Sequence, residues 1–286
     1  MLTDRQREAL RALDQESVAF DVPLAPETSL GIGGLADGLV EVPNATALAR
    51  LVRWCRRERL VLTPLQRATD AMVRDAGIRG VVCRLGAGWS GMEIHADGVL
   101  LGGEGSARAA AQGLQEGVRS GDPVPAWLVS GGSVANALVG RGESHEAAGV
   151  VAVQVVLGKG VAETVPRSRL ALSDPRLGLR AEAVVAGVLV EPSGAGTPLP
   201  TELPGVRLFV DPPKGSSAGE LLTRSGLLGV RVRGARIDDV QPNRLLTEPG
   251  ATAHDVELLV DWARRTVAAQ WGVELVLALR IIGARR

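Results

Sequence analysis

The chain has 286 residues, of which 45% are hydrophobic and 22% charged, the proportions of a folded globular protein with a sizeable core. Its 32 acidic and 32 basic side chains balance, so no net charge favours nucleic acid or an anionic membrane as a partner. Aromatic residues make up 2% of the chain and tyrosine is absent, which leaves few side chains to stack on a planar ligand ring.

The N-terminal segment MLTDRQREALRAL predicts a short helix from Thr3 to Leu13, with Thr3 or Asp4 as its cap. This segment lacks the apolar centre of a signal peptide. No apolar run in the chain reaches the ~18 residues that a membrane-spanning helix needs. The sequence therefore predicts a cytoplasmic protein.

A glycine-rich stretch, PLAPETSLGIGGLADGLVEV, occupies residues 23–42. Gly31, Gly33 and Gly34 lie between an apolar entry and an exit in which apolar and polar residues alternate. Glycine suits a backbone that adopts positive φ or that another chain or a ligand approaches closely. On local physics alone, the run is either a tight turn or a ligand-binding segment.

A helix is predicted from Ala45 to Arg59, because Asn44 is a good cap and the apolar residues recur on one face. The strands Leu60–Thr63 and Val81–Leu85 follow. Cys55 and Cys83 fall in the helix and the second strand without CxxC spacing, which favours two buried free thiols over a disulfide or a metal site.

The second half of the chain reads as further strands and helices separated by glycine and proline. Val150–Leu157 and Ala183–Val190 are valine-rich strand candidates, and Glu191–Gly205 is a Pro/Gly-rich connector that marks a domain boundary. The expected helices are Ala107–Gly117, Ala218–Ser225 with Ser217 as cap, and a long helix that Thr252 begins and Gly272 closes. The histidines show no metal-binding spacing.

Several stretches together resemble the UDP-N-acetylenolpyruvoylglucosamine reductase (MurB-type) family. They are TSLGIGGLADGLVEV, VRDAGIRG, GATAHDVELLVDWARRTVAAQWGVEL and the terminal RIIG. The resemblance implies an α+β fold, with a two-part flavin-type (vanillyl-alcohol-oxidase/PCMH-like) domain followed by a smaller α/β substrate-binding domain. The expected divisions are 1–82, 83–190, 191–278 and a C-terminal strand, 279–286, that returns to the first subdomain.

The resemblance also implies a reaction. Working members of the family use bound FAD to relay a hydride from NADPH to the enolpyruvyl double bond of a UDP-sugar. The product is UDP-N-acetylmuramate, a peptidoglycan precursor, and a serine and a glutamate complete the proton chemistry. General acid catalysis of this kind contributes about 10² to 10⁴ in rate.

The family's first cofactor loop carries three glycines, a serine and an asparagine. Here these positions are Gln66, Arg67, Ala68, Thr69 and Asp70. Side chains fill the space that a backbone phosphate cradle needs open, and Asp70 adds a negative charge where two phosphates would lie. In the second glycine-rich segment of the family, Gly131, Gly132 and Ser133 are retained.

Other family positions bear on catalysis. The family arginine that polarises the substrate corresponds to Arg176, which is alternatively an exposed loop arginine. The family's proton-donating serine and nearby asparagine become Arg207 and Asp211, and its glutamate becomes Ala278. Arginine holds its protons at neutral pH, and alanine has none to give.

Three hypotheses stay open from the sequence. The chain is a divergent, working FAD- and NADPH-dependent reductase, or it is a cofactor-free, catalytically inactive relative that binds a nucleotide sugar or a protein. The third is an unrelated glycine-rich β protein. None of them predicts a nucleic-acid or membrane partner.

Overall fold

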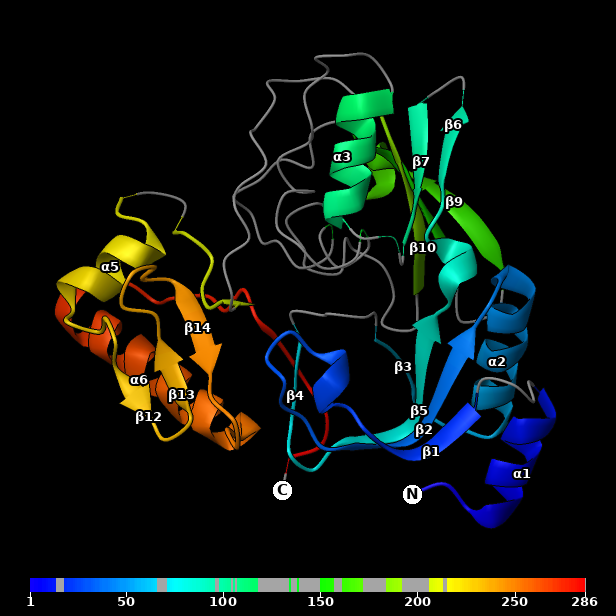
Figure 1. Cartoon of the computed structure of the whole chain (residues 1–286), viewed down its shortest axis with the longest axis horizontal. Coiled ribbons are helices and arrows are strands. Elements are labelled where there is room, and N and C mark those ends of the chain that lie inside the picture. Colours follow the sequence, from blue (N-terminus) through cyan, green and yellow to red (C-terminus); the bar gives the residue numbers. More distant parts are fainter. Residues whose placement is uncertain are drawn as a thin grey trace.

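The computed structural model describes residues 1–13, 18–65, 71–95, 98–103, 105, 107–117, 134, 138, 150–156, 161–171, 184–191, 206–212 and 215–285. Helices and strands are mixed along the chain, which confirms an α+β fold. They form two lobes (Figure 1). The larger lobe carries the N-terminal part of the chain, and the smaller lobe contains α5, α6 and the strands around them.

The first sheet has the strand order β1-β2-β5-β3. Its strands are β1 (Val18–Pro23), β2 (Leu35–Val42), β5 (Ile78–Leu85) and β3 (Leu62–Pro64). Strand β1 is antiparallel to β2, whereas β2, β5 and β3 are parallel. The helices α1 (Asp4–Leu13) and α2 (Ala45–Arg57) pack with the apolar side chains of β2 and β5 in one core. The division expected at residue 82 falls inside β5.

The second sheet is antiparallel, with the order β6-β7-β10-β8-β9. Its strands are β6 (Met92–His95), β7 (Gly98–Gly102), β10 (Val184–Val190), β8 (Val150–Val156) and β9 (Ala162–Pro166). The valine-rich strands β8 and β10 suit the pleated surface of a sheet and pack against α3 (Ala107–Gly117). Short 3-10 turns lie at η1 (Ala25–Glu27), η2 (Ala87–Trp89) and η4 (Arg167–Arg169).

The smaller lobe is a sheet covered by two helices. The strand order is β11-β14-β13-β12, formed by β11 (Val206–Arg207), β14 (Arg244–Thr247), β13 (Ala235–Ile237) and β12 (Arg231–Val232). The helices α5 (Ala218–Arg224) and α6 (Ala253–Trp271) close over the apolar face. Apolar side chains of α6 are buried there, and Phe209 lies in the same core with 0% exposure.

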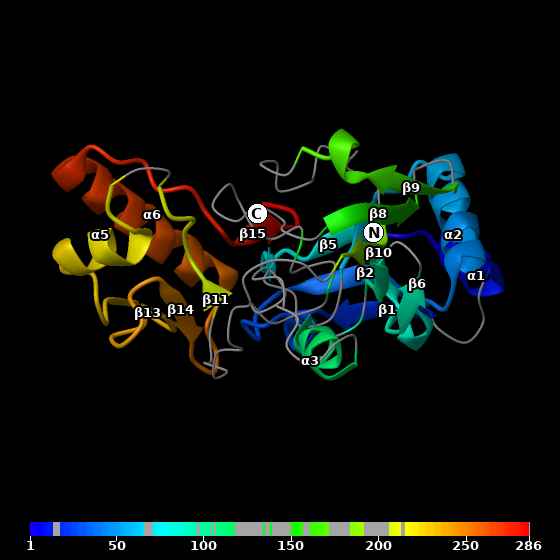
Figure 2. The same cartoon turned by 90° about the horizontal axis from the view of Figure 1, so that it is seen from above.

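Polar and backbone contacts join the two lobes. Strand β4 (Ala71–Val73) pairs in parallel with β15 (Arg280–Ile282), which lies between the lobes in Figure 2. The carboxylate of Asp75 accepts from the backbone N–H groups of Ala253 and His254, at 3.0 and 3.1 Å, and so caps α6 from the other lobe. Arg74 pairs with Glu257 at 2.7 Å.

The helix caps expected from the sequence are confirmed, and the caps are Thr3, Asn44, Ser217 and Thr252. Thr3 rather than Asp4 caps α1, because the Thr3 hydroxyl oxygen accepts from the N–H of Gln6. Helix α2 ends at Arg57, two residues earlier than predicted. Arg59 is left-handed, with φ 55°, and the N–H of Leu60 donates to the carbonyl of Cys55. Among the described residues, no helix combines the length and apolarity that crossing a membrane requires.

Asp37 is a buried carboxylate in β2, with 3% exposure. It accepts from Arg79 Nη1 at 2.9 Å and from the N–H of Gly80 at 3.1 Å. Burial by itself raises the pKa of Asp37, but these hydrogen bonds outweigh burial and hold the pKa below its ordinary value. The charged form is therefore the one that stabilises the fold.

Asp37→Asn should lower the free energy of unfolding by about 1.5–3 kcal/mol at pH 7. Because the folded pKa is depressed, the stabilisation is complete above the unfolded pKa of about 3.9 and is lost as the pH falls through the folded value. Urea denaturation of wild type and variant from pH 7 to pH 3 measures this difference. Asp21→Asn is the matched control, since Asp21 pairs with Arg7 at an exposed site and should matter less. A difference that is constant with pH contradicts the assignment.

Candidate functional site

The glycine turn between η1 and β2 is packed against the chain itself. Gly31 adopts φ 63°, and a Cβ placed there meets nothing within 4 Å. A Cβ on Gly33 would lie 2.9 Å from the Cβ of Val73, and one on Gly34 would lie 2.3 Å from the carbonyl oxygen of Asp75. Two of the three glycines are thus required by close approach of the end of β4 and of the segment that follows it. Contact of these glycines with a cofactor stays a prediction.

Two backbone donors of this turn already have acceptors within the chain. The N–H of Gly31 donates to the carbonyl of Thr28, and the N–H of Gly34 donates to the carbonyl of Arg74, both at 3.1 Å. A backbone phosphate cradle needs N–H groups that point at the anion and are free to donate. These two groups do not meet that requirement.

A charged cluster lies near the start of the predicted cofactor loop. Leu65, the last described residue before that loop, hydrogen-bonds to β5. In β5, Arg84 donates to Glu41 at 3.0 Å and to Glu27 at 2.7 Å. Burial lowers the pKa of Arg84, but the bonds to Glu27 and Glu41 outweigh it and raise the pKa. With two carboxylates on one guanidinium, this cluster carries a net negative charge.

Among the described residues near the predicted loop, the N–H groups of Gly31 and Gly34 and the guanidinium of Arg84 already have partners within the chain. Flavin binding by this chain stays a prediction. The predicted loop positions Thr69 and Asp70 lie outside the described residues, as do Gln66 to Ala68. The predicted cofactor positions Gly131, Gly132 and Ser133 and the candidate Arg176 also lie outside them.

Arg207, which the resemblance places at the position of the family serine, takes part in an ion pair. Arg207, at the end of β11, bonds through Nη2 to the carboxylate of Asp211. The other oxygen of Asp211 accepts from the backbone N–H of Ala218 at 2.8 Å, at the start of α5. Both side chains are about one third exposed, at 37% and 38%. The two substituted positions thus form one connected structural unit.

The segment after Arg207 pairs with the segment that contains Ala278. The N–H of Ala278 donates to the carbonyl of Leu208 at 2.9 Å, and the N–H of Val210 donates to the carbonyl of Val276 at the same distance. Phe209 and Leu277 form an antiparallel bridge between these bonds. Arg207 and Ala278 therefore lie on or next to neighbouring extended segments, with Ala278 directly beside Leu208.

Sequence reasoning missed two residues at this place. Asn243 holds the backbone of Phe209 from both sides, because its oxygen accepts from the Phe209 N–H at 2.9 Å and its amide donates to the Phe209 carbonyl at 2.7 Å. Arg244 stands directly opposite Arg207 in the β11–β14 pair. The sequence feature that could have drawn attention to these two residues is their polar pair directly before the apolar Leu245.

Other candidate chemistry is absent where the structure describes the chain. Cys55 and Cys83 are buried and form no disulfide, as predicted, and burial raises the pKa of Cys55 to about 12, so it stays protonated. No group of three or more His, Cys, Asp or Glu side chains in the described ranges is placed to hold a metal ion.

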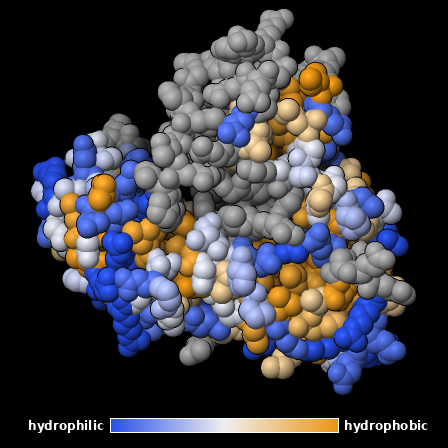
Figure 3. Space-filling view, in the orientation of Figure 1, coloured by the Kyte–Doolittle hydropathy of each residue, from blue (hydrophilic) through white to orange (hydrophobic). Residues whose placement is uncertain are grey.

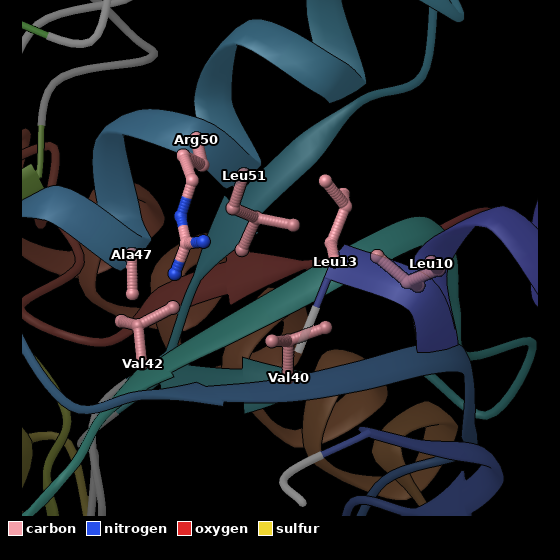
Figure 4. A pocket seen from close by; sticks show the side chains of 7 residues that line it. All are labelled: Leu10, Leu13, Val40, Val42, Ala47, Arg50 and Leu51. Atoms are coloured by element: carbon pink, nitrogen blue, oxygen red, sulfur yellow. The ribbon is translucent and has the colours of Figure 1, made fainter. Parts of the chain in front are cut away.

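A small hollow lies between α1, α2 and β2 (Figure 4). Its lining is apolar except for one arginine and consists of Leu10, Leu13, Val40, Val42, Ala47, Arg50 and Leu51. Most of these side chains belong to the core of the first sheet. No acid–base pair lines the hollow, so we interpret it as a packing gap in the core.

Comparison with known proteins identifies the family. A model of the UDP-N-acetylenolpyruvoylglucosamine reductase C-terminal domain matches residues 205–282. A protein of that reductase name from Anaeromyxobacter sp. (strain Fw109-5) is 33% identical, over 93% of this chain and 89% of its own length. One from Desulfosudis oleivorans is 30% identical, over 97% and 98% respectively.

A solved structure supports the fold. The crystal structure of UDP-N-acetylenolpyruvylglucosamine reductase from Thermus caldophilus aligns with a TM-score of 0.71, covering 92% of this chain and 98% of that one at 21% identity. Because full-length relatives reach 33% identity and the fold is shared, the chain belongs to the UDP-N-acetylenolpyruvoylglucosamine reductase family.

Proposed function

We propose that this chain keeps the scaffold of the reductase family as a binding module for a UDP-sugar and does not reduce the enolpyruvyl group. The observation that carries the proposal is the ion pair between Arg207 and Asp211. By resemblance, these positions hold the proton-donating serine and an asparagine. A guanidinium keeps its protons at neutral pH, and this one is already bonded to a carboxylate.

The second proton-transfer position supports the same proposal. Ala278 replaces the family glutamate and lies on the segment next to Arg207. Its methyl group neither donates a proton nor carries charge. Since each acid–base group contributes about 10² to 10⁴ in rate, losing both leaves little reduction even if hydride transfer were supported.

The cofactors FAD and NADPH belong to the family's reaction and come to this chain by resemblance. The proposal that flavin does not bind is supported by the N–H groups of Gly31 and Gly34, which already have acceptors, and by the carboxylates around Arg84. The substitution of three glycines by Gln66, Arg67 and Ala68 points the same way.

The second candidate is the family reaction itself. Relatives named UDP-N-acetylenolpyruvoylglucosamine reductase match nearly the whole chain at 30–33% identity, which favours it. On this alternative, other side chains supply the protons, and the product is UDP-N-acetylmuramate for the peptidoglycan pathway.

An absorption spectrum and a coupled assay separate the two candidates. The purified protein should be colourless, retain no FAD after gel filtration, and oxidise no NADPH with the enolpyruvyl UDP-sugar. It should bind UDP-N-acetylglucosamine in calorimetry. The Desulfosudis oleivorans relative of the reductase name, purified in parallel, is the positive control for the assay. Retained flavin with substrate-dependent NADPH oxidation would establish the working reductase instead.

A further inference from the structure

Two arginines, Arg207 and Arg244, lie at opposed positions in the sheet of the smaller lobe. Val206, Leu245 and Ile237 face the core, so their neighbours along the strands face away from it. The register pairs Arg207 directly with Arg244. Opposed side chains in an antiparallel pair have Cβ atoms about 4.5–5.5 Å apart, and like charges there repel.

Arg244 has no acceptor for its buried nitrogen among the described residues. Its Nη1 is out of contact with solvent and makes no hydrogen bond. The nearby carboxylate of Asp238 accepts from the backbone N–H of Val240 at 2.9 Å, in its own turn. Burial lowers the pKa of Arg244, and the charge of Asp238 offsets part of that effect. A buried guanidinium nitrogen without an acceptor is costly, and an anion bound to the same guanidinium is one way to offset that cost.

The neighbouring arginines are paired, which sets Arg244 apart. Arg231 bonds to Glu248 at 3.1 Å, and Arg236 lies 3.7 Å from Asp239. Hydrophilic residues gather over β12 and β13 on this side of the lobe (Figure 3). Arg207 uses Nη2 for Asp211, and a guanidinium has five N–H donors in all, so donors are left for a second anion.

We propose that Arg244 and Arg207 together bind one oxyanion group, a phosphate or a carboxylate, of a small-molecule ligand. Two arginines at directly opposed strand positions can aim their guanidinium groups at the oxygens of one such group, and binding it offsets their mutual repulsion. The inference rests on the proposed function in one respect, the identification of the ligand as a UDP-sugar. The anion would then lie at the position of the family serine.

Calorimetry with four anionic probes tests the site, using the full chain at low salt. The probes are inorganic phosphate, inorganic pyrophosphate, malonate and UDP-N-acetylglucosamine. Arg244→Gln and Arg207→Gln should each weaken binding at least tenfold. Arg231→Gln is the matched control and should bind like wild type, because it is an exposed arginine of the same lobe with its own partner. If Arg244→Gln does not fold, Arg207→Gln carries the test.

The outcomes separate the site from the proposed function. Binding of phosphate or pyrophosphate but not malonate assigns a phosphate ligand, and the reverse assigns a carboxylate. Pyrophosphate binding without UDP-N-acetylglucosamine binding supports the site and contradicts the UDP-sugar function. UDP-N-acetylglucosamine binding that both glutamine variants retain contradicts the site and leaves the function standing. Absence of binding by all four probes overturns the site.

Discussion

Phe209→Ala should lower the free energy of unfolding of the smaller lobe by about 3–5 kcal/mol. Phe209 is fully buried, and its ring fills the core between the β11–β14 sheet and α6. Alanine would leave a cavity there, since the segment is fixed by the side chain of Asn243 and by the bridge to Leu277 and collapses poorly into the space. Urea denaturation followed by tryptophan fluorescence measures the change.

The chain provides a matched control for this substitution. Phe20 is the other of its two phenylalanines, and it is partly exposed in β1. Its ring lies 5.0 Å from the guanidinium of Arg7 and 4.9 Å from that of Arg11. Phe20→Ala should therefore cost about 1 kcal/mol. Equal losses for the two variants would mean that Phe209 is not the centre of its core.

Gly34→Ala should destabilise the larger lobe by about 3 kcal/mol, at the upper end of the range for overpacking. The added Cβ would lie 2.3 Å from the carbonyl oxygen of Asp75 and 2.6 Å from the nitrogen of Gly77. Both are backbone atoms, so no side chain can move aside to relieve the contact. Thermal and urea denaturation without any cofactor measure the loss.

Gly31→Ala is the control for Gly34→Ala. Gly31 is left-handed, with open space around its Cα, so alanine there should cost only about 1–2 kcal/mol through its backbone conformation. If Gly34 were kept for a cofactor alone, Gly34→Ala would leave the stability of the cofactor-free protein unchanged. That outcome would refute the packing role.

Local signals made the elements predictable from sequence. Ser217 and Thr252 form capping boxes, and Gly272 ends α6 in the left-handed conformation. Each of these devices depends on residues three or four apart, which a sequence displays directly. The valine-rich strands β8 and β10 were equally visible, because their composition suits a buried strand whatever its partners are.

The candidate site was only half predictable. The loss of the serine and glutamate at Arg207 and Ala278 follows from the resemblance. The register that sets Arg244 opposite Arg207 depends on how two distant strands pair, and no local pattern reports it. For the same reason, the packing role of Gly34 became visible only when Asp75 was placed against it.

The parallel pairing of β4 with β15 has a topological consequence. The chain enters the smaller lobe after β10 and leaves it through β15, which pairs in parallel with β4 of the larger lobe. The smaller lobe is thus tethered at both ends, like an inserted domain. A chimera that takes the smaller lobe from a relative therefore needs two crossover points. The transferred lobe must also carry residues that contact Arg74 and Asp75, as Glu257 and the start of α6 do here.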